Sequence, residues 1–160
     1  MAKIEIHAAP TTTGSGYPPP HAAAFAGRVR RRLGDAAGLT KVGVNLTTLP
    51  PGVASSLRHW HEVEDEMVFV VEGEVVLVDD TGESLLRRGE AAGFRAGDAN
   101  GHTVVNRSDR PATILEIGMR PDTDTCHYPD LDLVCVDADG GSRFTRRDGT
   151  PVDAAPDRPL

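Results

Sequence analysis

Hydrophobic and polar residues alternate along much of the chain after residue 40, with the period of two that is typical of half-buried β-strands. Residues 42–46 carry Val or Leu at every second position. Residues 67–71 and 75–78 are short apolar runs rich in β-branched residues, and Gly73 lies between them. The pattern predicts three strands, the last two of them joined as a hairpin by a tight turn.

Further strands are predicted on either side of short turns rich in Gly, Asp and Pro, at residues 85–86, 104–105, 113–117, 133–136 and 142–145. Many short strands at regular spacing, with almost no helix, predict an all-β antiparallel sandwich or barrel. The chain shows no internal repeat. We therefore expect one barrel within residues 41–160, completed by a C-terminal hairpin.

The first forty residues follow a different pattern. Residues 4–6 are compatible with a short edge strand, whereas residues 11–20, rich in Thr, Gly and Pro, indicate turns and extended chain. Apolar residues recur every four positions between residues 25 and 33, which predicts one short helix ending near Gly34. We expect residues 1–40 to form an extended arm that packs on the barrel or on a partner subunit.

Length and charge limit the classes of function. The 160 residues suit one ordinary domain, and a net charge of −7 argues against nucleic acid, which needs a basic face. We interpret the one basic run, residues 28–32, as a solvated face. The sequence shows no membrane span and no basic-then-apolar leader, so a soluble, cytoplasmic protein is expected. Cys126 and Cys135 do not form a disulfide framework and fit a reducing compartment. Cys126, beside His127, is interpreted as a buried or idle thiol in preference to a ligand or a reactive thiol.

A group of histidines carries the candidate chemistry. His59 and His61 stand two positions apart, so on a strand their imidazoles face the same side. Glu66 can join them only if the chain bends at the polar residues 62–65, and His102 follows later in the chain. Three imidazoles and one carboxylate suit one divalent transition metal, namely Fe, Mn, Ni, Co, Cu or Zn, rather than Ca or Mg. Four ligands leave coordination positions open for substrate.

The stretch from Gly52 to Gly73 resembles the first motif of the cupin family. In that motif a His-X-His pair is followed by Glu after four residues and by Gly after six more. His59, His61, Glu66 and Gly73 fit this spacing, and Gly52 stands one residue further from His59 than is usual.

Residues 89–106 resemble the second cupin motif, because Gly89, Gly97, His102 and Asn106 occur in the expected order. Two departures appear: Arg95 replaces the usual proline, and the interval from Gly97 to His102 is two residues longer. Both affect the local turn, and neither removes a ligand.

Segments 94–98, 100–102, 115–118 and 128–130 are similar to a group of small bacterial cupins. The resemblance implies a double-stranded β-helix (jelly-roll) barrel, a small-molecule ligand and a homodimer. It also implies His59, His61, Glu66 and His102 as metal ligands.

Other polar and aromatic residues receive weaker interpretations. Arg95, Asn106, Glu116 and Tyr128 are candidates for lining the pocket, with Asn106 favoured as a hydrogen-bonding residue of a turn or strand edge. Trp60 should point away from its histidine neighbours. No role is expected for His7, His21 and His127. The remaining acidic residues of this region are interpreted as a solvated rim: Glu62, Glu64, Asp65, Asp79 and Asp80.

Three functions remain open from the sequence. The resemblance favours a dioxygenase-type metalloenzyme acting on a small organic acid or phenol. A metal-dependent isomerase, decarboxylase or lyase, in which the metal only polarises a carbonyl or enolate, is the first alternative. A module that binds a small molecule without catalysis is the second. The sequence identifies no general acid or base.

Overall fold

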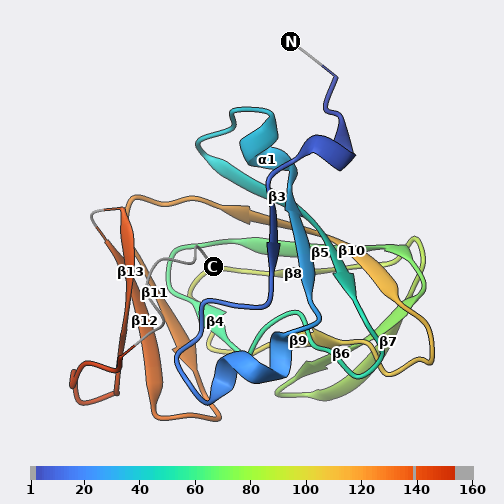
Figure 1. Cartoon of the computed structure of the whole chain (residues 1–160). Coiled ribbons are helices and arrows are strands. Elements are labelled where there is room, and N and C mark those ends of the chain that lie inside the picture. The colour runs from blue at the N-terminus through green and yellow to red at the C-terminus, as the bar shows by residue number, and fades with distance from the viewer. Residues whose placement is uncertain (1–2, 139, 154–160) are drawn as a thin grey trace.

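The computed structural model describes residues 3–138 and 140–153. Its strands form three antiparallel sheets, one of six strands and two smaller ones (Figure 1). The six-stranded sheet has the order β1 (Thr11–Thr13), β2 (Val29–Arg32), β3 (Val42–Leu49), β10 (Ala112–Met119), β5 (Glu66–Glu72) and β8 (Ala91–Phe94). The four-stranded sheet has the order β13 (Gly141–Thr145), β12 (Leu133–Ala138), β11 (Asp124–Tyr128) and β4 (Trp60–His61). The three-stranded sheet has the order β7 (Gly82–Arg87), β6 (Glu74–Asp79) and β9 (Thr103–Val105).

The two smaller sheets meet at a backbone bridge between His59, which precedes β4, and His102, which precedes β9. A second isolated bridge joins Ala54 to Val105 in β9. The four-stranded and three-stranded sheets, at the left and lower right of Figure 1, are therefore continuous through the segment that contains both histidines.

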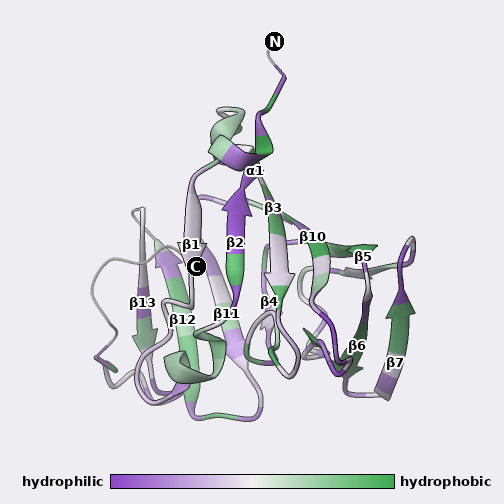
Figure 2. Ribbon diagram, turned by 45° about the vertical axis from the view of Figure 1, so that its right-hand side comes forward, coloured by the Kyte–Doolittle hydropathy of each residue, from purple (hydrophilic) through white to green (hydrophobic). Residues whose placement is uncertain are grey.

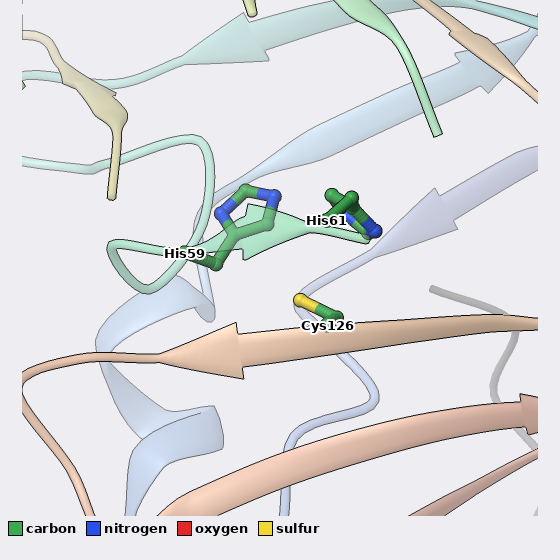
Figure 3. A group of neighbouring side chains, drawn as sticks. All are labelled: His59, His61 and Cys126. Atoms are coloured by element: carbon green, nitrogen blue, oxygen red, sulfur yellow. The ribbon is translucent and has the colours of Figure 1, made fainter. Parts of the chain in front are cut away.

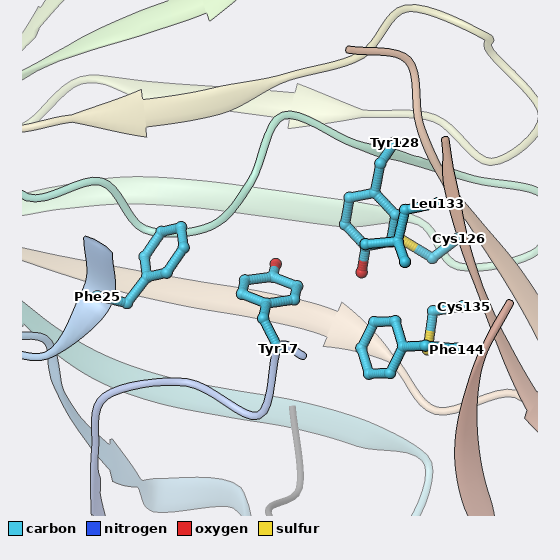
Figure 4. Close-up of a cluster of buried hydrophobic side chains, with 7 residues drawn as sticks. All are labelled: Tyr17, Phe25, Cys126, Tyr128, Leu133, Cys135 and Phe144. Carbon is cyan, nitrogen blue, oxygen red and sulfur yellow. The ribbon is translucent and has the colours of Figure 1, made fainter. Parts of the chain in front are cut away.

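Two apolar clusters support this arrangement. The first joins the six-stranded sheet to β6 and β9 and includes Leu49, Val70 and Ile114, which are fully buried. The second joins the N-terminal segment to the four-stranded sheet. In Figure 4 the Tyr17 ring lies beside Phe25 and Tyr128, with centroid separations of 5.2 and 5.7 Å. Aromatic packing of this kind stabilises the docking of the N-terminal segment.

The strands predicted from alternation, apolar runs and flanking turns are confirmed as β3, β5, β6, β7, β9, β10, β12 and β13. The helices among the described residues are short: the 3-10 segments Ile6–Ala8 and His21–Phe25, and α1 (Leu33–Ala36). No helix among these residues is long and apolar enough to cross a membrane.

The N-terminal region differs from its prediction in three respects. Ile6 begins a 3-10 turn instead of ending an edge strand, and residues 11–13, expected as turn, form β1. The four-residue period of residues 25–33 does not produce a helix, because Val29–Arg32 is strand β2, paired with β1 and β3. Backbone pairing with the edge of β3 overrides the weak local helix signal.

The basic run is therefore part of the sheet, and Figure 2 shows the arrowhead end of β2 in purple. In a strand, residues two apart face the same side. Arg28, Arg30 and Arg32 all line the large pocket inside the molecule, and Arg28 is only 4% exposed. The interpretation of residues 28–32 as a solvated face is wrong.

Candidate metal centre and its pocket

The four predicted ligands come together from three parts of the chain. His59 precedes β4 and His61 ends it, and a non-strand segment at residues 62–65 turns the chain so that Glu66 opens β5. His102 is held opposite His59 by the backbone bridge. The bend that the odd spacing to Glu66 required is thus present.

Glu66 lies at the centre of this cluster. Its Oε2 is 3.4, 3.6 and 3.1 Å from the Nε2 atoms of His59, His61 and His102 respectively. Metal–nitrogen and metal–oxygen bonds of about 2.1 Å place neighbouring ligand atoms roughly 3.0–3.4 Å apart. The ligand atoms of His59, Glu66 and His102 all lie within 4.8 Å of one another and could hold one divalent ion, whereas His61 joins this group through its contact with Glu66.

Hydrogen bonds at the second ring nitrogens orient two of the three imidazoles. Nδ1 of His59 contacts the Leu57 carbonyl at 2.9 Å, and Nδ1 of His61 is hydrogen-bonded to the Asp124 carboxylate. Such contacts fix the tautomer and leave Nε2 free for a metal. Nδ1 of His102 is buried with no hydrogen-bond partner among the residues that the structure describes, and its ring stacks on Phe94 with centroids 3.5 Å apart.

The charges of the metal-free cluster follow from these contacts. Burial opposes ionisation of Glu66, but hydrogen bonds from His102 and His59 outweigh it and hold the pKa of Glu66 well below its usual range. Burial also opposes a charged His61, but the hydrogen bond to Asp124 and the Cys126 thiol raise the pKa of His61 to about 12. Burial lowers the pKa of His102. A cation entering this site would replace the proton on His61.

Cys126 and Asp124 are neighbours of the site that the sequence interpretation missed. Figure 3 shows His61 on β4 and His59 just before it, with Cys126 on the adjacent strand β11, where Cys126 is the cross-strand partner of His61. Ligand atoms of these three residues lie within 4.8 Å of one another, as do those of His61, Glu64 and Asp124. The alternation of β11 was the available signal, since Asp124 and Cys126 stand two residues apart and share a face.

Glu64 does not belong to a solvated rim. It lines the large pocket, and its carboxylate lies over Gly118, where a Cβ atom would come within 2.0 Å of Glu64 Oε1. Burial, reinforced by the nearby charge of Glu66, raises the pKa of Glu64 to about 8. A carboxyl group of this kind beside a metal centre is suited to proton transfer.

The cluster lies between two hollows. The larger, of about 770 Å³, is lined by all four predicted ligands together with Glu116 and Tyr128. The smaller, of about 190 Å³, shares His61, Glu66 and His102 and contains Arg95. A small molecule in the larger hollow would reach the open side of a bound ion.

Asn106 occupies a different environment from the other pocket candidates. It is fully buried, its amide nitrogen donates to the carbonyls of Leu49 and Arg110 at 2.7 Å each, and its oxygen accepts from Ser108. The side chain stabilises the turn before β10 instead of facing the pocket, as expected for a hydrogen-bonding turn residue.

His127 has partners that sequence spacing did not reveal. It is the cross-strand neighbour of Trp60, the two rings stack at 4.2 Å, and Nε2 of His127 is 2.8 Å from Glu62. Trp60 thus packs on the side of β4 opposite to His61, in agreement with its predicted direction.

The longer loop before His102 remains anchored to the site. The Gly97 amide donates to the carbonyl of His61 at 2.8 Å, and Gly97 has a φ of +74°, which favours glycine. The Ala96 amide donates to the Asp65 side chain at 2.7 Å. The extra residues are accommodated in the loop between Gly97 and His102, and His102 keeps its position.

Comparisons with known proteins agree with this geometry. A family model described as a cupin domain matches residues 45–118. The crystal structure of a sugar phosphate isomerase from a cupin superfamily, from Silicibacter pomeroyi, has a TM-score of 0.91 and 48% identity, covering 95% of this chain and 97% of that chain. A candidate sugar phosphate isomerase from Acidithiobacillus ferrooxidans has a TM-score of 0.71 and 29% identity, covering 79% and 80% of the two chains.

A cupin protein from Bacteroides fragilis is also similar, with a TM-score of 0.50 and 25% identity over 57% of this chain and 75% of that chain. None of the curated proteins compared with the chain matches it. The predicted all-β jelly-roll architecture is confirmed by these neighbours and by the observed strands. The chain belongs to the cupin superfamily.

Proposed function

We propose that this cupin is a metal-dependent isomerase acting on a small phosphorylated sugar. One observation carries the proposal: the candidate metal cluster shares its 770 Å³ pocket with the arginine side chains of residues 28, 30 and 32. One cavity could thus receive a carbonyl oxygen at the metal and an anionic group at the arginines. The structural relative that is 48% identical is named as a sugar phosphate isomerase, which supports the same class of reaction.

The ligands in this proposal are His59, His61, Glu66 and His102. A divalent ion held there would polarise a carbonyl or hydroxyl of the substrate. Glu64 lines the same pocket, with its carboxyl group over Gly118, and is placed to move a proton between adjacent carbons. Val68 and Phe94 form apolar parts of the wall and limit the access of water to the reacting atoms.

The test compares metals and substrates directly. Protein stripped of metal would be reloaded separately with Fe, Mn, Ni, Co, Cu and Zn, then offered sugar phosphates, keto acids, phenols and flavonols. Oxygen uptake would be followed by electrode, beside product analysis under nitrogen. We expect isomerisation of a sugar phosphate under nitrogen, and activity with Zn(II), which has no redox chemistry.

Two results would contradict the proposal. Substrate-dependent oxygen uptake that disappears with Zn(II) would identify a dioxygenase, the function favoured by the sequence resemblance. Saturable binding of one compound without product under any condition would identify a non-catalytic binding protein.

We further propose a homodimer, as the family resemblance implies. β8 lies at an edge of the six-stranded sheet, where β5 is its neighbour in the order of the described strands. An edge strand can associate with a second copy of the chain. Light scattering at micromolar concentration should give twice the mass of one chain, and a monomeric mass would refute the dimer.

A further inference from the structure

Arg28 is a buried guanidinium whose hydrogen bonds among the described residues all go to backbone oxygens, and it also lies 5.6 Å from the centroid of the Phe25 ring. Nε and one Nη of Arg28 donate to the Gly14 carbonyl at 3.0 and 2.8 Å, and the other Nη donates to the Ser55 carbonyl. A guanidinium has five N–H donors, so these three bonds leave one N–H on each terminal nitrogen. A buried cation without a carboxylate partner is costly unless another group compensates it.

The neighbouring arginines show how the pocket is charged. Arg30 pairs with Glu116 through contacts of 3.0 and 3.3 Å. Arg32 and Arg120 both contact one carboxylate, that of Asp35. These three arginines and Arg28 all line the pocket, so four guanidinium groups are matched by two paired carboxylates on this wall. The pocket lining also includes Glu64, Glu66 and Asp137, and among the described residues Arg28 is the arginine of this group without an acidic partner.

A series of contacts through Ser55 and Ser56 links Arg28 to the candidate metal centre. The Ser55 carbonyl that accepts from Arg28 adjoins Ser56, whose Oγ is 3.3 Å from Nδ1 of His59. One small molecule could therefore contact the open side of the metal cluster and the arginine wall at the same time. A phosphorylated sugar has this form, with its phosphate several bonds from the carbonyl carbon.

We propose that Arg28, assisted by Arg30, forms the subsite that binds the phosphate monoester of the substrate. This inference rests on the proposed function and specifies which part of the pocket recognises the anion. Two guanidinium groups suit a dianionic phosphate better than a single carboxylate, because each supplies parallel N–H donors. Glu116 pairs with Arg30 and neutralises its charge, so Arg28 supplies the positive charge that remains for the phosphate.

The alternative role for Arg28 is to connect the Gly14 and Ser55 loops, with no ligand involved. Both roles predict that removing the guanidinium affects stability. They differ in ligand binding. If Arg28 only connects the two loops, its removal leaves the affinity of the pocket for phosphate unchanged.

Calorimetric titration of the metal-loaded protein separates these roles. The probes are an unreactive hexitol phosphate, the same hexitol without phosphate, and a hexonate that carries a carboxylate instead. Wild-type protein should prefer the phosphate compound, and Arg28→Met should lose roughly 30-fold in affinity for that compound alone. Arg107→Gln, which removes an exposed arginine paired with Glu83, is the matched control and should bind as wild type does. Equal affinities for phosphate in wild type and Arg28→Met, or tighter binding of the hexonate, would overturn the subsite.

A second measurement does not depend on the folding of the variant. Wild-type protein loaded with Mn(II) should broaden the phosphorus resonance of inorganic phosphate, and hexitol phosphate should reverse the effect. Unchanged phosphorus relaxation would refute the subsite. Phosphate binding without isomerisation of any sugar phosphate would refute the proposed function and leave the subsite established. Full isomerase activity in folded Arg28→Met would refute the subsite and leave the proposed function standing.

Discussion

His59 and His102 exchange both of their backbone hydrogen bonds: the amide of His59 donates to His102 at 3.0 Å, and the amide of His102 donates to His59 at 2.8 Å. The two residues are far apart in sequence, yet this closed pair fixes the separation of their side chains. The candidate metal centre is therefore held by sheet geometry between two motifs, and the loop before His102 can vary in length without moving the imidazole.

Each predicted ligand should be needed for metal retention. We expect His59→Ala, His61→Ala and His102→Ala to lose the bound metal, because each change removes one nitrogen donor. Glu66→Gln should weaken binding less, since an oxygen donor remains and only the compensating charge is lost. Plasma emission spectrometry on purified proteins measures the metal content.

His127→Ala is the control for these variants, because its ring stacks on Trp60 on the side of β4 opposite to His61. It should retain the metal content of the wild type. Full occupancy in His102→Ala would show that the second motif does not supply a ligand.

Asp124 should control metal affinity without being a required ligand. Its carboxylate is hydrogen-bonded to Nδ1 of His61 and also accepts from the Val63 amide at 2.9 Å. Loss of such an orienting partner typically reduces metal affinity by about 10–100-fold. We expect this decrease for Asp124→Asn in a competition titration with a chelating dye, whereas Asp122→Asn, at an exposed position, should bind as wild type does. Unchanged affinity in Asp124→Asn would contradict the orienting role.

Metal binding should release a proton near neutral pH. The contact with Asp124 raises the pKa of His61 to about 12 in the metal-free protein, despite its burial, whereas an unfolded histidine titrates near 6.5. The stabilisation from this protonated pair is complete below about pH 6.5 and is lost as the pH rises toward the folded pKa. At pH 7.5 a metal must displace that proton to reach Nε2.

Calorimetry in buffers of different ionisation enthalpy counts the released protons. We expect about one more proton released by wild-type protein than by Asp124→Asn, in which the pKa of His61 returns toward its ordinary value. Identical proton release by the two proteins would show that the Asp124 contact does not hold the proton on His61.

The sequence was sufficient for the barrel because its strands are alternating or continuous apolar segments bounded by turns rich in Gly, Asp and Pro. Residues 42–46 alternate, residues 67–71 and 113–117 are mostly apolar, and these segments became β3, β5 and β10. The N-terminal strands were missed for a physical reason. β2 is stabilised by pairing with β3, a long-range contact, and the four-residue recurrence of residues 25–33 outweighed its period of two.

The candidate ligands could be grouped from the sequence because the two cupin motifs contain them at characteristic spacings. Asp124, Cys126 and Glu64 have no such spacing relative to His61, and only the pairing of β11 with β4 and the bend at residues 62–65 bring them together. The basic run illustrates the same limit. A run of charged residues in a sequence suggests a solvent-exposed surface. Here alternate arginines line the pocket, where Arg30 pairs with Glu116 across the sheet and Arg32 pairs with Asp35 three residues further on.

The Arg30–Glu116 pair should be strongly coupled. Their side chains are 14% and 19% exposed, and the Thr47 hydroxyl also donates to Glu116 at 2.6 Å. Removing one member leaves the other as an uncompensated charge, so Arg30→Met should lower the free energy of unfolding by about 2–3 kcal/mol. Replacing both by Met should recover most of that loss, as denaturant unfolding would show. Additive losses in the double variant would mean that the two side chains act independently.

The close approach at Gly101 should be needed to keep His102 in place. A Cβ atom at Gly101 would come within 2.6 Å of the Pro129 ring and 3.1 Å of the Arg58 guanidinium, and a proline ring has little freedom to move. Gly101→Ala should therefore displace the segment that pairs with His59 and lower the free energy of unfolding by about 1–3 kcal/mol. Metal content should fall with it, because the imidazole of His102 moves with its backbone.

Gly93→Ala is the matched control: its Cβ would meet only the Glu66 carbonyl, at 3.9 Å, an ordinary contact. Denaturant unfolding and plasma emission spectrometry on both variants decide the matter, and a Gly101→Ala protein with wild-type stability and metal content would show that the loop can yield without moving His102.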